Sequence, residues 1–215
     1  MMKRSPHIFC DFDGTITARD TLVFLSSQLG AGPDFVRNIG DGLRAGRITL
    51  RDAIADEMRT VRLTFEQAAE ILLREIPLDP GFASLVRWSE SREVPFTILS
   101  AGFHELIRLF VPEESYPWVR VLANNIEADP VRGWQCRFRD DGPFGHDKQL
   151  TLREAMNRGE YAIFIGDGFS DRQAAEVADE VFAKYSLTDY CRERRIDFHE
   201  YQTLADVQRK LQDLL

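Results

Sequence analysis

The segment Ile8-Phe9-Cys10-Asp11-Phe12-Asp13-Gly14-Thr15 decides the expected fold. Its first three residues are apolar, as in a strand that is buried on both faces of a parallel sheet. Two carboxylates follow at positions i and i+2, which point to the same side of an extended chain while Phe12 turns toward the core. Gly14 then lets the chain turn out of the strand. The segment therefore predicts a buried strand that delivers Asp11 and Asp13 to one place.

Two later apolar runs share this design. Phe96–Leu99 ends at Ser100, and Tyr161–Ile165 ends at Gly166 and Asp167. A helical pattern follows each run, so the chain reads as repeated βα units of an α/β protein with a doubly wound parallel sheet. Ligands of such sheets bind beyond the carboxyl ends of the strands, which makes these polar residues site candidates. Weaker strand candidates are Val119–Leu122 and Val181–Ala183.

The stretch between the first two runs has apolar residues at helical spacing and contains no strand candidate. Thr49 with Asp52, and Thr64 with Gln67, have the spacing of helix N-caps with a partner three residues on. We expect a helical insert at residues 18–80 that forms a small cap on a core of residues 1–17 and 81–215. The alternative is a set of ordinary crossover helices. The apolar positions are Phe35, Val36, Ile39, Leu43, Leu50, Ile54, Phe65, Ala68, Leu72 and Ile76.

Two weaker patterns lie in the second half of the chain. Trp134, Cys136 and Phe138 alternate with polar residues after a turn, which predicts a β-hairpin. Thr203 and Asp206 precede apolar residues at helical spacing, which predicts a capped C-terminal helix.

Composition narrows the function classes. The chain of 215 residues has a formal net charge of −8, which argues against nucleic acid or an anionic membrane surface as partner. The three cysteines have no metal-ligand spacing and suit a reducing compartment, so we expect a cytoplasmic protein. The apolar stretch near the N-terminus is short, so we expect no signal peptide, and no apolar run approaches the ~18 residues of a membrane span. Protein partners cannot be inferred.

The paired carboxylates after the first strand suit hydrolytic chemistry. One carboxylate can act as nucleophile while the other acts as general acid and base. Two carboxylates this close raise each other's pKa unless a cation lies between them. Oxygen ligands beside a phosphate suit Mg²⁺. The structural alternative is an Asp pair that caps a turn before a helix.

Two other strand ends and one expected helix start carry polar residues. Ser100-Ala101-Gly102 offers a hydroxyl and backbone N–H groups at an expected helix N-terminus, which suits phosphate binding; the alternative is a plain N-cap serine. Lys148 opens a helical pattern and could neutralise phosphoryl charge, unless it is a solvated surface lysine. Asp167 and Asp171 form a further acidic pair. His104 and His146 lie beside these motifs, and we assign neither a role.

Taken together and in order, these motifs resemble those of the haloacid dehalogenase superfamily, from Asp11 to Asp171. The resemblance implies a phosphatase in which Asp11 attacks phosphorus and Asp13 is the general acid and base. It also implies that Ser100, Ala101, Gly102 and Lys148 hold the phosphoryl group. Asp11, the Asp13 backbone carbonyl and Asp167 would bind Mg²⁺, with Asp171 supporting the metal site from behind. The family's dehalogenases lack an acid at the position of Asp13.

The same resemblance bears on the substrate, a small phosphorylated metabolite. A helical cap at this place is similar to those of the family's phosphoserine phosphatases and methionine-salvage phosphatases, and the segment from Cys10 to Thr17 with Asp20 is closer to the salvage group. Asp56 or Glu57 stands where phosphoserine phosphatases have an arginine for the substrate carboxylate. Rival readings are a non-catalytic phosphometabolite-binding protein and a phosphotransferase. Candidate substrate contacts are Asp20, Phe24 and Arg44.

Overall fold

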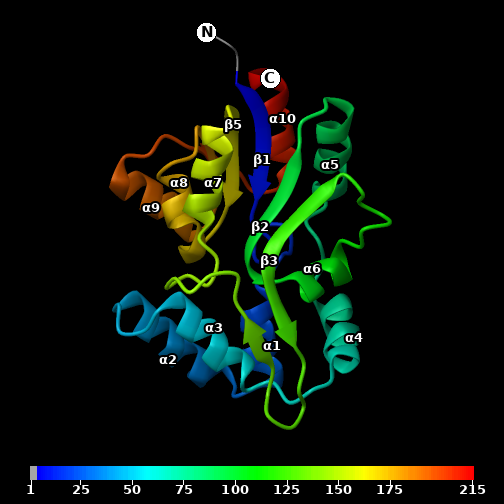
Figure 1. Ribbon diagram of the computed structural model, residues 1–215, viewed down its shortest axis with the longest axis vertical. Coiled ribbons are helices and arrows are strands. Elements are labelled where there is room, and N and C mark those ends of the chain that lie inside the picture. The colour runs from blue at the N-terminus through cyan, green and yellow to red at the C-terminus, as the bar shows by residue number, and fades with distance from the viewer. Residues whose placement is uncertain (1–3) are drawn as a thin grey trace.

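The computed structural model describes residues 4–215, so residues 1–3 of the predicted core lie outside the described part (Figure 1). Within it, a seven-stranded sheet has the order β4-β3-β2-β1-β5-β6-β7. All neighbours pair in parallel except β3 and β4, which are antiparallel. The α/β class with a mostly parallel sheet is confirmed. The strands are β1 (Ser5–Cys10), β2 (Phe96–Phe103), β3 (Val119–Glu127), β4 (Gln135–Arg137), β5 (Glu160–Gly166), β6 (Glu180–Ala183) and β7 (His199–Glu200).

Helices cover both faces of the sheet. Helices α5, α6 and α10 lie on one side, and α7, α8 and α9 lie on the other (Figure 1). In residues 4–215 no helix is both long enough and apolar enough to cross a membrane. The helices are α1 (Thr21–Leu29), α2 (Pro33–Arg44), α3 (Leu50–Met58), α4 (Phe65–Glu75), α5 (Phe82–Ser91), α6 (His104–Phe110), α7 (Lys148–Asn157), α8 (Arg172–Ala175), α9 (Ser186–Arg194) and α10 (Leu204–Leu214).

The central strand β1 is buried on both faces, as its apolar run predicts. Ile8 and Cys10 belong to the apolar cluster that includes the buried residues of α5 and α10. Phe9 points the opposite way, into the cluster formed with α7, α8 and α9. Because successive side chains of a strand alternate between faces, β1 holds the two helical layers together.

The helical insert comprises α1 to α4 and lies beyond the carboxyl ends of the strands (Figure 1). Both predicted N-caps of the insert are confirmed as capping boxes, at α3 and α4. The chain enters and leaves the insert side by side, because Thr17 and Leu78 form an antiparallel bridge. Apolar side chains of the insert, among them Leu25 and Met58, join the same cluster as Ile8. Two adjacent chain segments thus connect the insert to the core, and apolar side chains pack it against the core.

The predicted hairpin is present as β3 and β4, and its tip reaches the insert. Trp134 is fully buried, stacks on Phe65 of α4 and donates its indole N–H to the Leu63 carbonyl. Two strands differ from the expectation. Strand β2 continues through Phe103 instead of ending before Ser100, and the two-residue β7 was too short to give a period-2 pattern.

Candidate active site

The three predicted strand ends meet at the carboxyl edge of the sheet. Strand β1 lies between β2 and β5, and Cys10 is in register with Ile98 on one side and Ile165 on the other. Asp11 is therefore the next residue at the point where the strand order changes direction, between β1 and β5. This is the usual ligand position in a doubly wound sheet.

A cavity of about 470 Å³ opens at this edge, between the sheet and the helical insert. The predicted site residues on its wall include Asp20 and Arg44 of the insert. Phe24 lies elsewhere, buried in the core under the Arg19 guanidinium, because Leu22 and Val23 take the cavity side of α1. The sheet contributes Asp11, Asp13, Ser100, Ala101, Gly102 and Asp167 to the wall.

Lys148 lies behind Asp11 rather than on the cavity wall. Its Nζ donates to Asp11 Oδ1 and to Asp171 Oδ1, at 2.7 Å each, and all three side chains are buried. Burial alone would lower the pKa of Lys148, but attraction to Asp11 and Asp171 raises it, so the lysine stays charged. Burial and then the charge of Asp171 raise the pKa of Asp11 to about 7, against the attraction of Lys148. Lys148 therefore favours the ionised form of Asp11.

Asp13 is held in place by the insert. Its Oδ1 accepts hydrogen bonds from the backbone N–H and the hydroxyl of Thr21, the first residue of α1. Burial, and next the charge of Asp20, raise the pKa of Asp13 well above its usual range. A carboxyl group that keeps its proton at neutral pH can act as a general acid.

Two glycines allow the carboxylates to come close. Gly14 has φ +76°, and a Cβ there would lie 2.5 Å from Asp167 Oδ2. A Cβ on Gly102 would lie 2.7 Å from Asp13 Oδ2. Any side chain at either position would displace a site carboxylate, so both glycines are part of the site's geometry.

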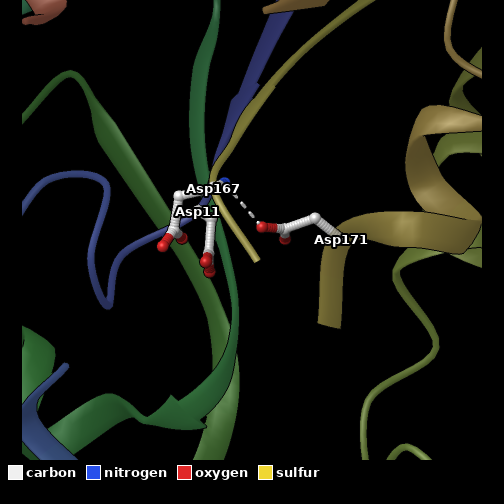
Figure 2. A group of neighbouring side chains, drawn as sticks. All are labelled: Asp11, Asp167 and Asp171. Carbon is white, nitrogen blue, oxygen red and sulfur yellow. Dashed lines mark hydrogen bonds between the residues drawn. The ribbon is translucent and has the colours of Figure 1, made fainter. Parts of the chain in front are cut away.

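One carboxylate oxygen from each of Asp11, Asp167 and Asp171 lies within 4.8 Å of the other two. Figure 2 shows the Asp11 and Asp167 side chains pointing the same way, whereas Asp171 reaches toward the backbone of Asp167. Asp171 Oδ2 accepts from the N–H groups of Asp167 and Gly168, and its other oxygen binds Lys148. Asp171 therefore has both oxygens engaged by the protein.

Asp167 is different, because its charge is poorly compensated. Within residues 4–215, the Thr15 hydroxyl is the side-chain donor that contacts its carboxylate, at 3.2 Å. Burial, then Asp171 and Asp11, raise the pKa of Asp167 well above its usual range. A divalent cation between Asp11 and Asp167 would remove this repulsion, and carboxylate and carbonyl oxygens are the ligands that Mg²⁺ prefers. The donor set fits Mg²⁺.

Ser100, Ala101 and Gly102 lie in an irregular end of β2, not at a helix N-terminus. The pairing of β2 with β3 shifts register between Leu99 and Phe103. The Gly102 N–H donates to Ser100 Oγ at 2.9 Å. Helix α6 starts only at His104.

The insert side of the cavity combines an apolar wall with one buried acid, Glu57. Glu57 is 8% exposed and lies on the cavity wall. Burial, and then the charge of Asp20, raise its pKa to about 8. Arg37 and Arg44 also reach this wall, but each pairs with an acid of its own helix, Asp34 and Asp41.

The sequence did not predict three residues that form hydrogen bonds with site residues and lie off the predicted motifs. Thr21 binds Asp13, His146 contacts the Ser100 carbonyl, and Asn124 contacts the Ala101 carbonyl. For His146, the sequence signal is its position two residues before Lys148, a predicted site residue. The contact of Asn124 with the Ala101 carbonyl depends on the register shift between β2 and β3, so no local sequence pattern marks it.

Comparisons with known proteins agree with this geometry. A family model of the haloacid dehalogenase-like hydrolases matches residues 8–176. Pdp3-interacting factor 1 of Schizosaccharomyces pombe is 33% identical, covering 99% of this chain and 97% of its own. The polyol phosphate phosphatase PYP1 of Saccharomyces cerevisiae is 30% identical, covering 97% and 93%.

More distant likenesses point the same way. A 2-hydroxy-3-keto-5-methylthiopentenyl-1-phosphate phosphatase of Bacillus cereus is 23% identical over 98% of each chain. The fold matches a phosphoserine phosphatase solved as a phospho-aspartyl intermediate analogue, with a TM-score of 0.73, 17% identity and coverage of 97% and 99%. The family resemblance seen in the sequence is confirmed: the chain belongs to the haloacid dehalogenase-like hydrolases and is a phosphatase.

Proposed function

We propose that the protein is a Mg²⁺-dependent phosphatase that uses Asp11 as a covalent nucleophile on small phosphomonoesters. The observation that carries this proposal is the convergence of Asp11, Asp13 and Asp167 on one cavity beside the Ser100 strand end. The helical insert at residues 18–80 acts as a cap, because it lies over the carboxyl edge of the sheet and supplies part of the cavity wall. The three cysteines are free, which supports a reducing compartment such as the cytoplasm.

The proposed reaction has two steps. In the first, an Asp11 oxygen forms a bond to phosphorus, the ester P–O bond breaks, and Asp13 gives its proton to the departing alkoxide. In the second, Asp13 takes a proton from water, the water oxygen attacks phosphorus, and inorganic phosphate leaves Asp11. The Ser100 hydroxyl and the Ala101 N–H hold the phosphoryl oxygens. Lys148 lies behind Asp11 and partly neutralises the negative charge that Asp11 and the phosphoryl group bring together. Asp11, the Asp13 backbone carbonyl and Asp167 would hold Mg²⁺, which would supply charge neutralisation of the phosphoryl group.

The substrate class that we propose is a small polyol phosphate. Glu57 carries this part of the proposal, because its buried carboxyl group faces the leaving-group end of the cavity and forms no ion pair with another described residue. A carboxylate on the substrate would be repelled by the charge of Asp20 and, above about pH 8, also by ionised Glu57. Uncharged hydroxyl groups can instead donate to or accept from these acids. The 30% identity to a polyol phosphate phosphatase supports the same class.

A keto-enol phosphate of the methionine-salvage type is the second candidate. The observation in its favour is the apolar part of the cap wall, which suits a methylthio group, together with the 23% identity to a salvage phosphatase. The apolar residues on this wall are Val36, Ile39, Leu43, Leu50, Ala53 and Ile54.

Release of inorganic phosphate from a panel of substrates tests the function. The panel compares glycerol phosphate and a sugar-alcohol phosphate with a keto-enol phosphate and phosphoserine in one Mg²⁺ buffer. We expect kcat/KM for a polyol phosphate to exceed that for phosphoserine by at least about tenfold, or ~1.4 kcal/mol of transition-state preference. A tenfold preference for phosphoserine would contradict our assignment of the cap. Alcohol-dependent transfer without phosphate release would indicate a phosphotransferase, and no turnover at all would indicate a binding protein.

Asp13→Asn tests the general acid. The amide keeps the shape and the hydrogen bond from Thr21 but has no proton to give. For an alkyl phosphate we expect kcat to fall by about 10²- to 10⁴-fold. With 4-nitrophenyl phosphate, whose leaving group needs no protonation, the first-turnover release of nitrophenolate should stay much closer to wild type. Stopped-flow measurement decides, and an equal first-turnover loss for both esters would exclude the acid role.

Glu57→Gln tests whether a buried acid is kept for specificity at the expense of stability. The pKa of Glu57 is about 8 in the folded protein against 4.5 ordinarily, so the native state binds the proton more tightly than the unfolded state. Stability therefore falls as pH rises from about 4.5 to about 8. We expect Glu57→Gln to raise the free energy of unfolding at pH 8 by on the order of 1–3 kcal/mol, with no gain at pH 4.5.

At a pH above 8, where wild-type Glu57 is ionised, the same variant should also lose discrimination against phosphoserine, because the repelling charge is gone. Chemical denaturation at the two pH values and kcat/KM for phosphoserine and a polyol phosphate give both readouts. Glu90→Gln, an exposed change on α5, is the matched control. A stability change that is the same at both pH values would show that Glu57 does not titrate as described.

A further inference from the structure

The irregular end of β2 leaves two backbone carbonyls without their regular sheet partners. Ser100, Ala101 and Gly102 lie inside the register shift between β2 and β3. Buried carbonyl groups need hydrogen-bond donors, and here two buried side chains from other parts of the chain supply them. His146 binds the Ser100 carbonyl and Asn124 binds the Ala101 carbonyl.

His146 lies in the loop before α7 and is 4% exposed. Its Nδ1 is 2.9 Å from the Ser100 carbonyl oxygen. Because a carbonyl only accepts, Nδ1 carries the proton, and Nε2 is left to face the Thr151 hydroxyl at 3.5 Å. Burial lowers the pKa of His146 to about 4, so the ring is neutral at physiological pH and keeps this one orientation.

Asn124 lies in β3 and is fully buried. Its Nδ2 donates to the Ala101 carbonyl at 2.7 Å, and its Oδ1 accepts from the Arg139 N–H at 2.9 Å. Both ends of the amide are therefore used, which sets its orientation. The same side chain ties the strand end to the loop that leads to His146 and Lys148.

These two contacts decide where the next N–H groups point. A peptide unit is planar and trans, so fixing the Ser100 carbonyl aims the Ala101 N–H the opposite way. Fixing the Ala101 carbonyl likewise aims the Gly102 N–H, which donates to Ser100 Oγ. The Ser100 oxygen thus accepts from Gly102, and its hydroxyl proton is left to donate toward the cavity, which Ser100 and Ala101 line.

We propose that His146 and Asn124 are positioning residues, which hold the backbone of residues 100–102 so that the Ser100 hydroxyl and the Ala101 N–H face the phosphoryl group. The proposal rests on the phosphatase function and adds two side chains that act through the backbone. Neither contacts the substrate. Their effect should therefore appear in phosphate binding and in turnover, while metal dependence stays unchanged.

The decisive set of variants removes and restores one hydrogen bond. His146→Leu removes the donor to Ser100, whereas His146→Asn keeps it, because the Asn Nδ2 occupies nearly the position of the His Nδ1. Asn124→Asp replaces the donor to Ala101 with an oxygen that repels that carbonyl. Asn157→Asp, at an exposed position at the end of α7, is the control for the chemical change. The readouts are kcat and KM with one good substrate, the inhibition constant of inorganic phosphate, and thermal unfolding.

For His146→Leu and Asn124→Asp we expect kcat/KM to fall by about 10- to 100-fold, less than for loss of a direct transition-state donor, with a parallel weakening of phosphate inhibition. His146→Asn should recover most of the loss, and Asn157→Asp should match wild type. Wild-type kinetics in folded His146→Leu would overturn the proposal, and so would equal losses in the Leu and Asn variants. If His146→Leu does not fold, Asn124→Asp decides by the same criteria. A wild-type protein without phosphatase activity would instead refute the proposed function.

Discussion

Asp11→Asn should lower kcat by several powers of ten, on the order of 10⁴- to 10⁶-fold, while the protein stays folded. The amide has the shape of the carboxylate but lacks the charge and the nucleophilic oxygen that form the bond to phosphorus. We expect the fold to persist because ionised Asp11 is itself an unfavourable group. Burial and Asp171 raise its pKa to about 7, and the neutral amide removes that repulsion. Lys148 keeps Asp171 as its partner.

The measurement is steady-state turnover of a polyol phosphate, with thermal unfolding as the check on folding. Asn at this position can deamidate back to Asp, so the variant must be verified by mass spectrometry before assay. Asp213→Asn, an exposed change in α10, serves as control and should match wild type. Activity within tenfold of wild type in a verified sample would exclude Asp11 as the nucleophile.

Removal of divalent cations should abolish turnover. Asp11 and Asp167 share one side of the cavity, and burial with neighbouring acids raises the pKa of both. Without a cation this site repels an anionic substrate, so EDTA should stop phosphate release and Mg²⁺ should restore it. Ca²⁺ should inhibit, because it is larger, takes more oxygen ligands and can occupy both Asp11 oxygens. Phosphate release in chelator, after Mg²⁺ and after Ca²⁺ gives the comparison.

Asp167→Asn links this effect to the site. With one ligand charge removed, the variant should need a much higher Mg²⁺ concentration for half-maximal activity, whereas Asp213→Asn should not. Mg²⁺ should also raise the thermal unfolding midpoint of wild type more than that of Asp167→Asn, since a ligand that binds the native state stabilises it. Full activity in chelator would contradict the metal site.

The core of the fold was predictable because its signals are local. The apolar runs at Ile8, Phe96 and Tyr161 end in polar residues, and buried parallel strands in βα units produce that pattern. The capping boxes at Thr49 and Thr64 span only three residues each. By contrast, the full length of β2 and the short β7 depend on pairing with distant strands, which no local pattern reports.

The residues of the site also differ in how well the sequence predicts them. Asp11, Asp13, Asp167 and Asp171 follow strands in sequence, so topology alone brings them together. The cap contacts depend on the rotation of each helix: α1 turns Leu22 and Val23 to the cavity and Phe24 into the core. Lys148 was expected at the phosphate, and the structure shows that it pairs with Asp11 and Asp171.

The most direct test of a covalent Asp11 mechanism is chemical trapping of the phosphorylated residue. In Asp13→Asn the second step lacks its general base, so 4-nitrophenyl phosphate with Mg²⁺ should fill the enzyme with the aspartyl phosphate. Acid quenching and borohydride reduction convert an aspartyl phosphate to homoserine, which peptide mass spectrometry can locate. We expect homoserine at position 11 and unchanged Asp at 167 and 171. Reduction at another residue, or a nitrophenolate burst without any reduced residue, would contradict Asp11 as the covalent nucleophile.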